Sequence, residues 1–130
     1  MWDSGSFSII AIGLFFSILF IQSGLDKAFN RQENLVMLKD HFANTFLRGA
    51  VPILLGIITL FELAAGLVSA YGIIMLHFGS GSKFILYGLY LSVLTLLMLF
   101  FGQRVANDHK GSETVTIYFA VAVLSLIYLS

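Results

Sequence analysis

The chain has 130 residues, of which 58% are hydrophobic and only 11% are charged, and its formal net charge at pH 7 is zero. Soluble domains carry about 25% charged residues, so this composition indicates an integral membrane protein. The balanced charge argues against nucleic acid as a partner. The absence of cysteine excludes disulfide relays, thiolate metal sites and iron–sulfur clusters within this chain.

Four apolar stretches predict four membrane-spanning helices, at about 7–29, 50–76, 84–104 and 113–130. Each comes close to the roughly 20 residues that cross the hydrocarbon core of a bilayer. The first stretch lacks the basic start and the cleavage pattern of a signal peptide, so we expect it to remain in the mature protein. The spans fill most of the chain, which predicts one all-α domain over 1–130, a four-transmembrane-helix bundle.

The connection between the first two spans predicts a further, amphipathic helix. Asn30 followed by Glu33 resembles a capping box, the pattern in which the two side chains bond the first free N–H groups of a helix. Apolar residues then recur at helical spacing at Leu35, Leu38, Phe42 and Phe46. We expect this helix to lie on the membrane interface. Further on, Pro52 marks the start of the second span, where the missing N–H of proline costs nothing.

The basic residues are distributed unequally between the two ends of the predicted bundle. Those in the connections between spans 1 and 2 and between spans 3 and 4 are Lys27, Arg31, Lys39, Arg48, Arg104 and Lys110. The opposite side has only Lys83. By the positive-inside rule these two connections face the cytoplasm and both chain termini face outward, to the periplasm in a Gram-negative bacterium.

Glu62 is the ionisable residue deepest in the predicted membrane region. It lies in an otherwise uncharged run from Gly49 to Leu76, roughly 15–20 Å from the near end of its helix at 1.5 Å per residue. A charge at that depth costs about 3 kcal/mol on insertion scales. Two interpretations stay open: Glu62 is a structural anchor between helices, or it lines a pocket, transfers protons or orients a ligand. Burial favours its protonated form unless a cation such as Lys27 or Arg104 reaches it.

Other polar side chains are expected at the same depth or closer to the cytoplasm. We expect Gln22 to be a hydrogen-bond neighbour of Glu62, and Gly66, with Ala70 four residues on, to let a second helix pack closely beside the carboxyl. The candidate cofactor-binding pocket, for a ligand that the residues do not identify, contains Gln22, Lys27, Glu62, Gln103, Arg104 and Asp108. No residue is assigned a catalytic role.

The remaining ligand-type residues predict no cofactor site in this chain. His41, His77 and His109 all lie outside the central parts of the predicted spans, so we expect no haem between helices, and no acidic or histidine cluster has metal-ligand spacing. The Gly-Ser run at 79–82 is typical of a turn and lacks the Lys of a phosphate-binding loop. The tyrosines are expected to be interfacial anchors or packing groups.

Three motifs resemble the DoxX family of small four-helix membrane proteins. These are Gln22 to Lys27 at the end of the first span, Glu62 with Gly66 in the second, and Gly102 to Asp108 after the third. The resemblance covers nearly the whole chain and implies a bacterial inner-membrane protein. It does not imply one activity: relatives have been linked to quinone-reducing oxidoreductases, to oxidative-stress complexes and to thiol maturation, the last of which the lack of cysteine argues against. The positions that it carries over are Gly24, Lys27, Glu62, Gly66, Gln103, Arg104 and Asp108.

These observations favour an accessory or structural subunit of a larger bacterial membrane complex, redox or respiratory and quinone-linked. Apolar helix faces would contact lipid and other membrane subunits. The isolated chain is not expected to be an enzyme. Two alternatives stay open: a stand-alone protein that binds a small amphiphile, a quinone or a lipid, and an assembly factor for other membrane proteins.

Overall fold

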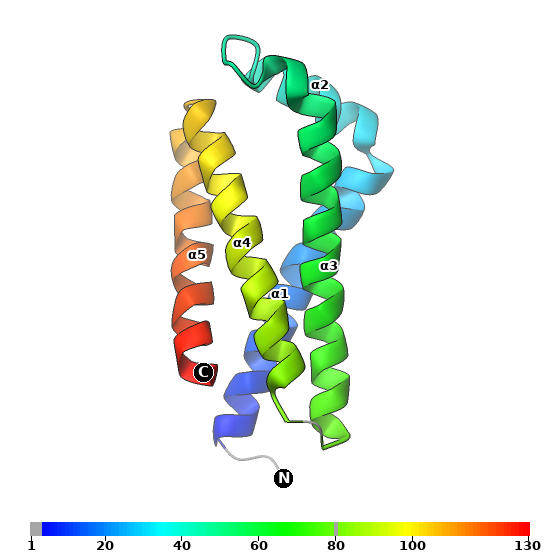
Figure 1. Ribbon diagram of the computed structural model, residues 1–130, viewed down its shortest axis with the longest axis vertical. Coiled ribbons are helices and arrows are strands. Elements are labelled where there is room, and N and C mark those ends of the chain that lie inside the picture. The colour runs from blue at the N-terminus through cyan, green and yellow to red at the C-terminus, as the bar shows by residue number, and fades with distance from the viewer. Residues whose placement is uncertain (1–3, 80) are drawn as a thin grey trace.

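The computed structural model describes residues 4–79 and 81–130, and these form an all-α bundle (Figure 1). Its elements in chain order are α1 (Ser4–Phe29), α2 (Arg31–His41), the short 3-10 helix η1 (Arg48–Ala50), α3 (Val51–His77), α4 (Lys83–Val105) and α5 (His109–Leu129). Within this described part, α1, α3, α4 and α5 are long and apolar enough to cross a membrane. The predicted four-helix transmembrane fold is therefore confirmed.

The ends of α3 and α4 lie within one residue of the predicted spans, whereas α1 begins three residues before position 7 and α5 begins four residues before position 113. At α5 the cause is a local cap: the Oδ1 atom of Asp108 accepts a hydrogen bond of 2.9 Å from the backbone N–H of Gly111. Such a cap satisfies one of the free N–H groups of the first turn and lets a helix begin in polar sequence. At α3 the prediction is confirmed, since Pro52 lies in its first turn.

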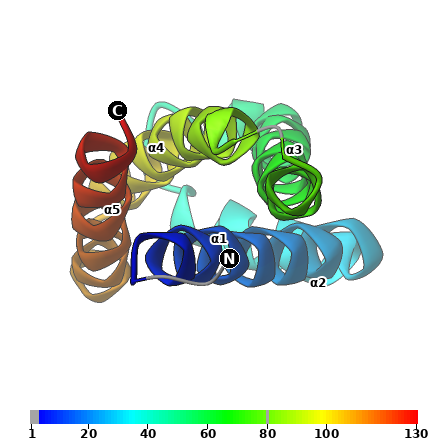
Figure 2. The ribbon, with the colours of Figure 1, turned by 90° about the horizontal axis from the view of Figure 1, so that it is seen from below.

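Consecutive long helices pack side by side, so that α3 lies between α1 and α4, while α5 packs against the other side of α4 (Figure 2). Small residues allow these approaches. A Cβ atom added at Gly66 of α3 would lie 2.6 Å from Cγ1 of Ile21 in α1, and one added at Gly72 would lie 2.6 Å from the backbone nitrogen of Ile85 in α4. The predicted close packing beside Gly66 is confirmed, as expected where lipid provides no hydrophobic force between helices.

Two aromatic residues of α1 fill the space between α1, α4 and α5. Phe16 and Phe20 are both 1% exposed and stack on one another with ring centroids 6.2 Å apart. They belong to a buried cluster that also contains Ala65, Leu89, Leu96, Val115 and Ala122. Large rings therefore bridge the distance between helices whose backbones do not approach closely.

The predicted interfacial helix exists as α2, but its ends differ from the prediction. The side chain of Asn30 makes no capping bond to the helix, and its Nδ2 donates to Oδ1 of Asp26 at 2.8 Å. The helix ends at His41, so Phe42 is buried in the following turn and Phe46 is 78% exposed outside the helix. The capping box and the extension to Phe46 were therefore wrong predictions.

Candidate functional site

An ion pair between α1 and α3 occupies the interior of the bundle. The Nζ atom of Lys27 lies 3.0 Å from Oε1 of Glu62, and it also donates a 2.8 Å hydrogen bond to Oγ of Ser23 one turn earlier on α1. Glu62 is 1% exposed, whereas the side chain of Lys27 is 19% exposed. The carboxylate is therefore enclosed, while the lysine reaches it from the edge of the bundle.

The antiparallel packing of α1 on α3 positions this pair. Gly24 faces Leu63 closely enough that an added Cβ would lie 2.7 Å from its Cδ2 atom. Lys27 follows Gly24 by three residues and Glu62 precedes Gly66 by one turn, so both charged side chains point into the same α1–α3 contact. The glycines set the distance between the backbones, and the register then brings the ammonium to the carboxylate.

The pairing is electrostatic more than directional. No hydrogen bond to Oε1 of Glu62 is formed within the described part of the chain, and the Lys27 ammonium donates to Oγ of Ser23. The 3.0 Å separation nevertheless places opposite charges in contact. The predicted condition for an ionised Glu62, a cation reaching it, is thus met by Lys27, while Arg104 has a different partner.

Gln22 does not take the place that was expected for it. Its side chain is exposed, and no hydrogen bond joins it to Glu62 among the residues described. Gln22 precedes Gly24 by two residues, which corresponds to about 200° around a helix, so it points away from α3. The prediction placed Gln22 on the wrong side of the helix.

The other three candidate residues form a separate cluster at the corner between α4 and α5. The backbone N–H of Asp108 donates to the carbonyl of Gln103 at 2.8 Å, and the Asp108 side chain caps α5. Arg104 Nη1 lies 3.0 Å from Nδ1 of His109. The Oε1 atom of Gln103 is buried and has no hydrogen-bond partner among the described residues.

The corner cluster is distant from the ion pair. Gly88 of α4 packs on Ser69 of α3, so in these antiparallel helices Glu62 is level with about residue 95 of α4. Gln103 lies eight residues further on, or about 12 Å along the helix axis. The six candidate residues therefore do not form one pocket, and their role in binding a ligand stays a prediction.

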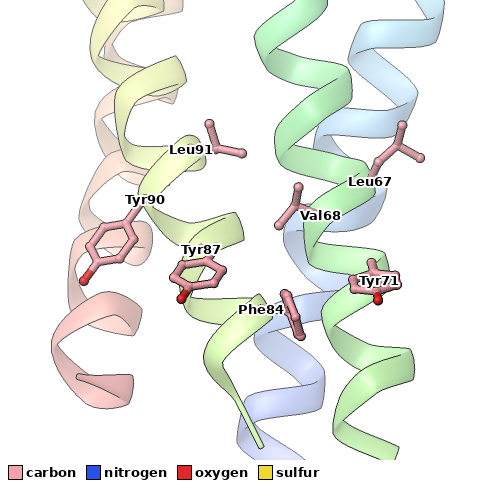
Figure 3. Close-up of a pocket in the computed structure, with 7 residues that line it drawn as sticks. All are labelled: Leu67, Val68, Tyr71, Phe84, Tyr87, Tyr90 and Leu91. Carbon is pink, nitrogen blue, oxygen red and sulfur yellow. The ribbon is translucent and has the colours of Figure 1, made fainter. Parts of the chain in front are cut away.

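A surface groove between α3 and α4 was not predicted from the sequence (Figure 3). It is an open groove with a volume of about 600 Å³, lined by Leu67, Val68, Tyr71, Phe84, Tyr87, Tyr90 and Leu91. Tyr87 and Tyr90 lie three residues apart on α4, but the sequence analysis interpreted them only as interfacial anchors or packing groups. Its lining is almost entirely apolar, in contrast to the ion pair.

The chain matches no protein-family model, no curated protein and no solved structure. The DoxX resemblance therefore stays a prediction from three motifs. In the part of the chain that the structure describes, no three His, Asp or Glu side chains are grouped as metal ligands would be. Among the described residues, the geometry defines a membrane-type four-helix bundle with a buried ion pair and an aromatic groove.

Proposed function

We propose that this chain is a DoxX-like, non-catalytic subunit of a larger bacterial membrane complex, redox or respiratory and quinone-linked. The observation that carries the proposal is the closure of the Lys27–Glu62 pair inside the bundle. The deepest ionisable group is already occupied in joining α1 to α3, so its role is to hold the bundle together. What the bundle then offers to other molecules is its outer surface.

That surface suits partner helices or lipid. Each long helix exposes large apolar side chains, such as Ile18 of α1, Leu60 of α3, Leu97 of α4 and Leu124 of α5, all more than half exposed. In a membrane, association of such faces with other helices depends on close packing and on the loss of lipid contacts. A bundle whose four long helices all expose apolar side chains is well suited to a position among other subunits.

The proposed location is the inner membrane of a bacterium, with both termini on the outer side. The support is the concentration of basic residues near α2, η1 and the α4–α5 corner, at the end opposite the α3–α4 turn (Figure 1). The chain has no native cysteine, so single-cysteine variants give a clean test. A membrane-impermeant maleimide added to intact cells should label Ser130→Cys and not Asn44→Cys, and the reverse pattern would invert the topology.

A second candidate function is a stand-alone protein that binds a small amphiphile, a quinone or a lipid. The α3–α4 groove favours it, because the groove is concave, apolar and bordered by tyrosines. An assembly factor for other membrane proteins is the third candidate, and no separate feature of the described residues favours it.

One purification distinguishes the three candidates. The tagged chain would be isolated from its own membrane in mild detergent and examined by mass spectrometry and visible absorption. Stoichiometric recovery with haem- or flavin-containing subunits is the expected result. Recovery of the chain alone with a bound quinone or lipid would favour the second function. Substoichiometric recovery with many unrelated membrane proteins would favour the third.

A further inference from the structure

The α3–α4 groove occupies the depth of one membrane leaflet only. On α4 its lining runs from Phe84, the second residue of the helix, to Leu91, a rise of about 10 Å. One leaflet contributes about half of the roughly 30 Å hydrocarbon core. A spanning partner helix would need a contact surface along the full thickness, so the groove has the length of a lipid chain and not that of a helix.

The walls of the groove are aromatic rings held in place by one another. The ring of Phe84 makes edge-to-face contacts with Tyr71 of α3 at 5.1 Å and with Tyr87 of α4 at 5.9 Å. Both tyrosines are 49% exposed, so their faces remain accessible from the bilayer (Figure 3). Because each of these rings already packs on another, an acyl chain that binds against them requires little rearrangement of the protein.

The mouth of the groove carries positive charge. Lys83 precedes Phe84, and its Nζ atom lies 5.2 Å from the centre of the Phe84 ring. The other six Lys and Arg residues belong to the opposite side of the predicted topology. The amino-terminal end of α4 adds a partial positive charge of its own, and the side chain of Ser82 does not cap it. The zero net charge of the chain thus conceals a local cationic site beside an apolar groove.

We propose that this groove binds a phospholipid with an anionic headgroup. The phosphate lies at Lys83 and the amino-terminal end of α4, and one acyl chain lies along the groove between Val68 of α3 and Leu91 of α4. Charge complementarity selects the anionic headgroup, and the one-leaflet length selects an acyl chain. The proposal does not depend on the larger complex, because all of these residues belong to this chain.

The test is site-resolved photocrosslinking of the full chain in nanodiscs. The probe is phosphatidylglycerol or phosphatidylcholine with the same diazirine-bearing acyl chain, followed by mapping of the labelled peptides. Labelling of residues 67–71 and 84–91 should be about five-fold higher with phosphatidylglycerol, which corresponds to about 1 kcal/mol for one basic residue. Lys83→Gln should abolish this preference. Lys110→Gln, with the same change of charge at the opposite end, should retain it.

A second variant tests the groove itself. Val68→Trp fills the groove and should reduce labelling of residues 84–91 by both lipids, with an unchanged circular dichroism spectrum showing that the helices remain. Equal labelling by the two lipids in the parent chain, or a preference that survives Lys83→Gln, would overturn the proposal. So would an endogenous quinone or a partner helix that is found cross-linked or bound in the groove in place of phospholipid.

Discussion

Replacing Lys27 by methionine should destabilise the bundle more than replacing Glu62 by glutamine. In the parent chain Glu62 is 1% exposed and its Oε1 accepts no hydrogen bond within the described residues, so removal of Lys27 leaves the carboxylate without a partner. Removal of one partner from a buried ion pair costs about 3–5 kcal/mol of stability. Water can partly reach the Glu62 carboxylate through the space left by the lysine, so we expect a loss of about 3 kcal/mol for Lys27→Met. In Glu62→Gln the released ammonium is already 19% exposed and can extend outward, so the expected cost is about 1 kcal/mol.

The double variant measures the coupling directly. With both charges absent, the α1–α3 contact keeps its glycines and contains no unpaired charge, and the remaining cost is that of a buried glutamine amide without a partner, about 2 kcal/mol. The two single costs add to about 4 kcal/mol, so the coupling energy is about 2 kcal/mol. The assay is reversible unfolding of the full chain in mixed micelles, followed by near-ultraviolet circular dichroism of the tyrosines. Lys39→Met removes an exposed lysine of α2 and should change stability by less than about 0.5 kcal/mol.

The charge state of Glu62 provides an independent check on the same reasoning. In the parent chain at neutral pH, infrared spectra should show no protonated-carboxyl band that disappears in Glu62→Gln, because Lys27 lies 3.0 Å from the carboxylate. The ion pair would be refuted as the anchor of the bundle by two results together. The stability losses of Lys27→Met and Glu62→Gln would add up to the loss in the double variant, and the parent chain would already show the infrared band of a protonated Glu62 carboxyl.

Two further predictions concern the contacts around the site. Gly66→Ala should cost about 1–3 kcal/mol in the same assay, because the new Cβ would lie 2.8 Å from the backbone nitrogen of Ile21. The control is Gly56→Ala on the same helix, whose new Cβ meets nothing within 4 Å and which should be neutral or slightly stabilising. Equal effects of the two substitutions would contradict the close contact at Gly66. Asp108→Ala should cost about 1 kcal/mol through loss of the cap on Gly111, whereas Asp108→Asn keeps an acceptor and should cost much less, so equal losses would contradict the cap.

The features that could be predicted from the sequence are those that depend on a single helix. Length and apolarity were sufficient for the four spans, and Glu62 was recognised as exceptional because an uncharged run surrounds it. Gln22 was misplaced because the rotation of α1 about its own axis is fixed by its contacts with α3, which no single span reveals. The early start of α5 was missed because the Asp108 cap overrides the polar composition of that turn.

The groove could not be predicted because it belongs to two helices together. Tyr71 and Tyr87 lie on different spans, and their rings are brought together through Phe84 only after Gly72 has allowed α3 and α4 to approach. Each tyrosine alone is typical of an interfacial anchor. Their arrangement as opposite walls of one groove follows from the register of the α3–α4 contact, which is a property of the packed pair.

A charge reversal separates a structural role of Glu62 from a chemical one. Lipid provides no hydrophobic force that fixes the register of α1 on α3, so the glycine contacts and the ion pair must do so. A shift of one turn would leave two charges unpaired inside the membrane. If the pair serves only this purpose, Lys27→Glu combined with Glu62→Lys should recover at least half of the stability lost in Lys27→Glu alone, where two carboxylates face one another. It should also retain the partners that co-purify with the parent chain. If Glu62 instead transfers protons or orients a ligand, the reversed chain will fold and assemble but lose the activity of its complex, because a lysine amine cannot accept a hydrogen bond while it is charged.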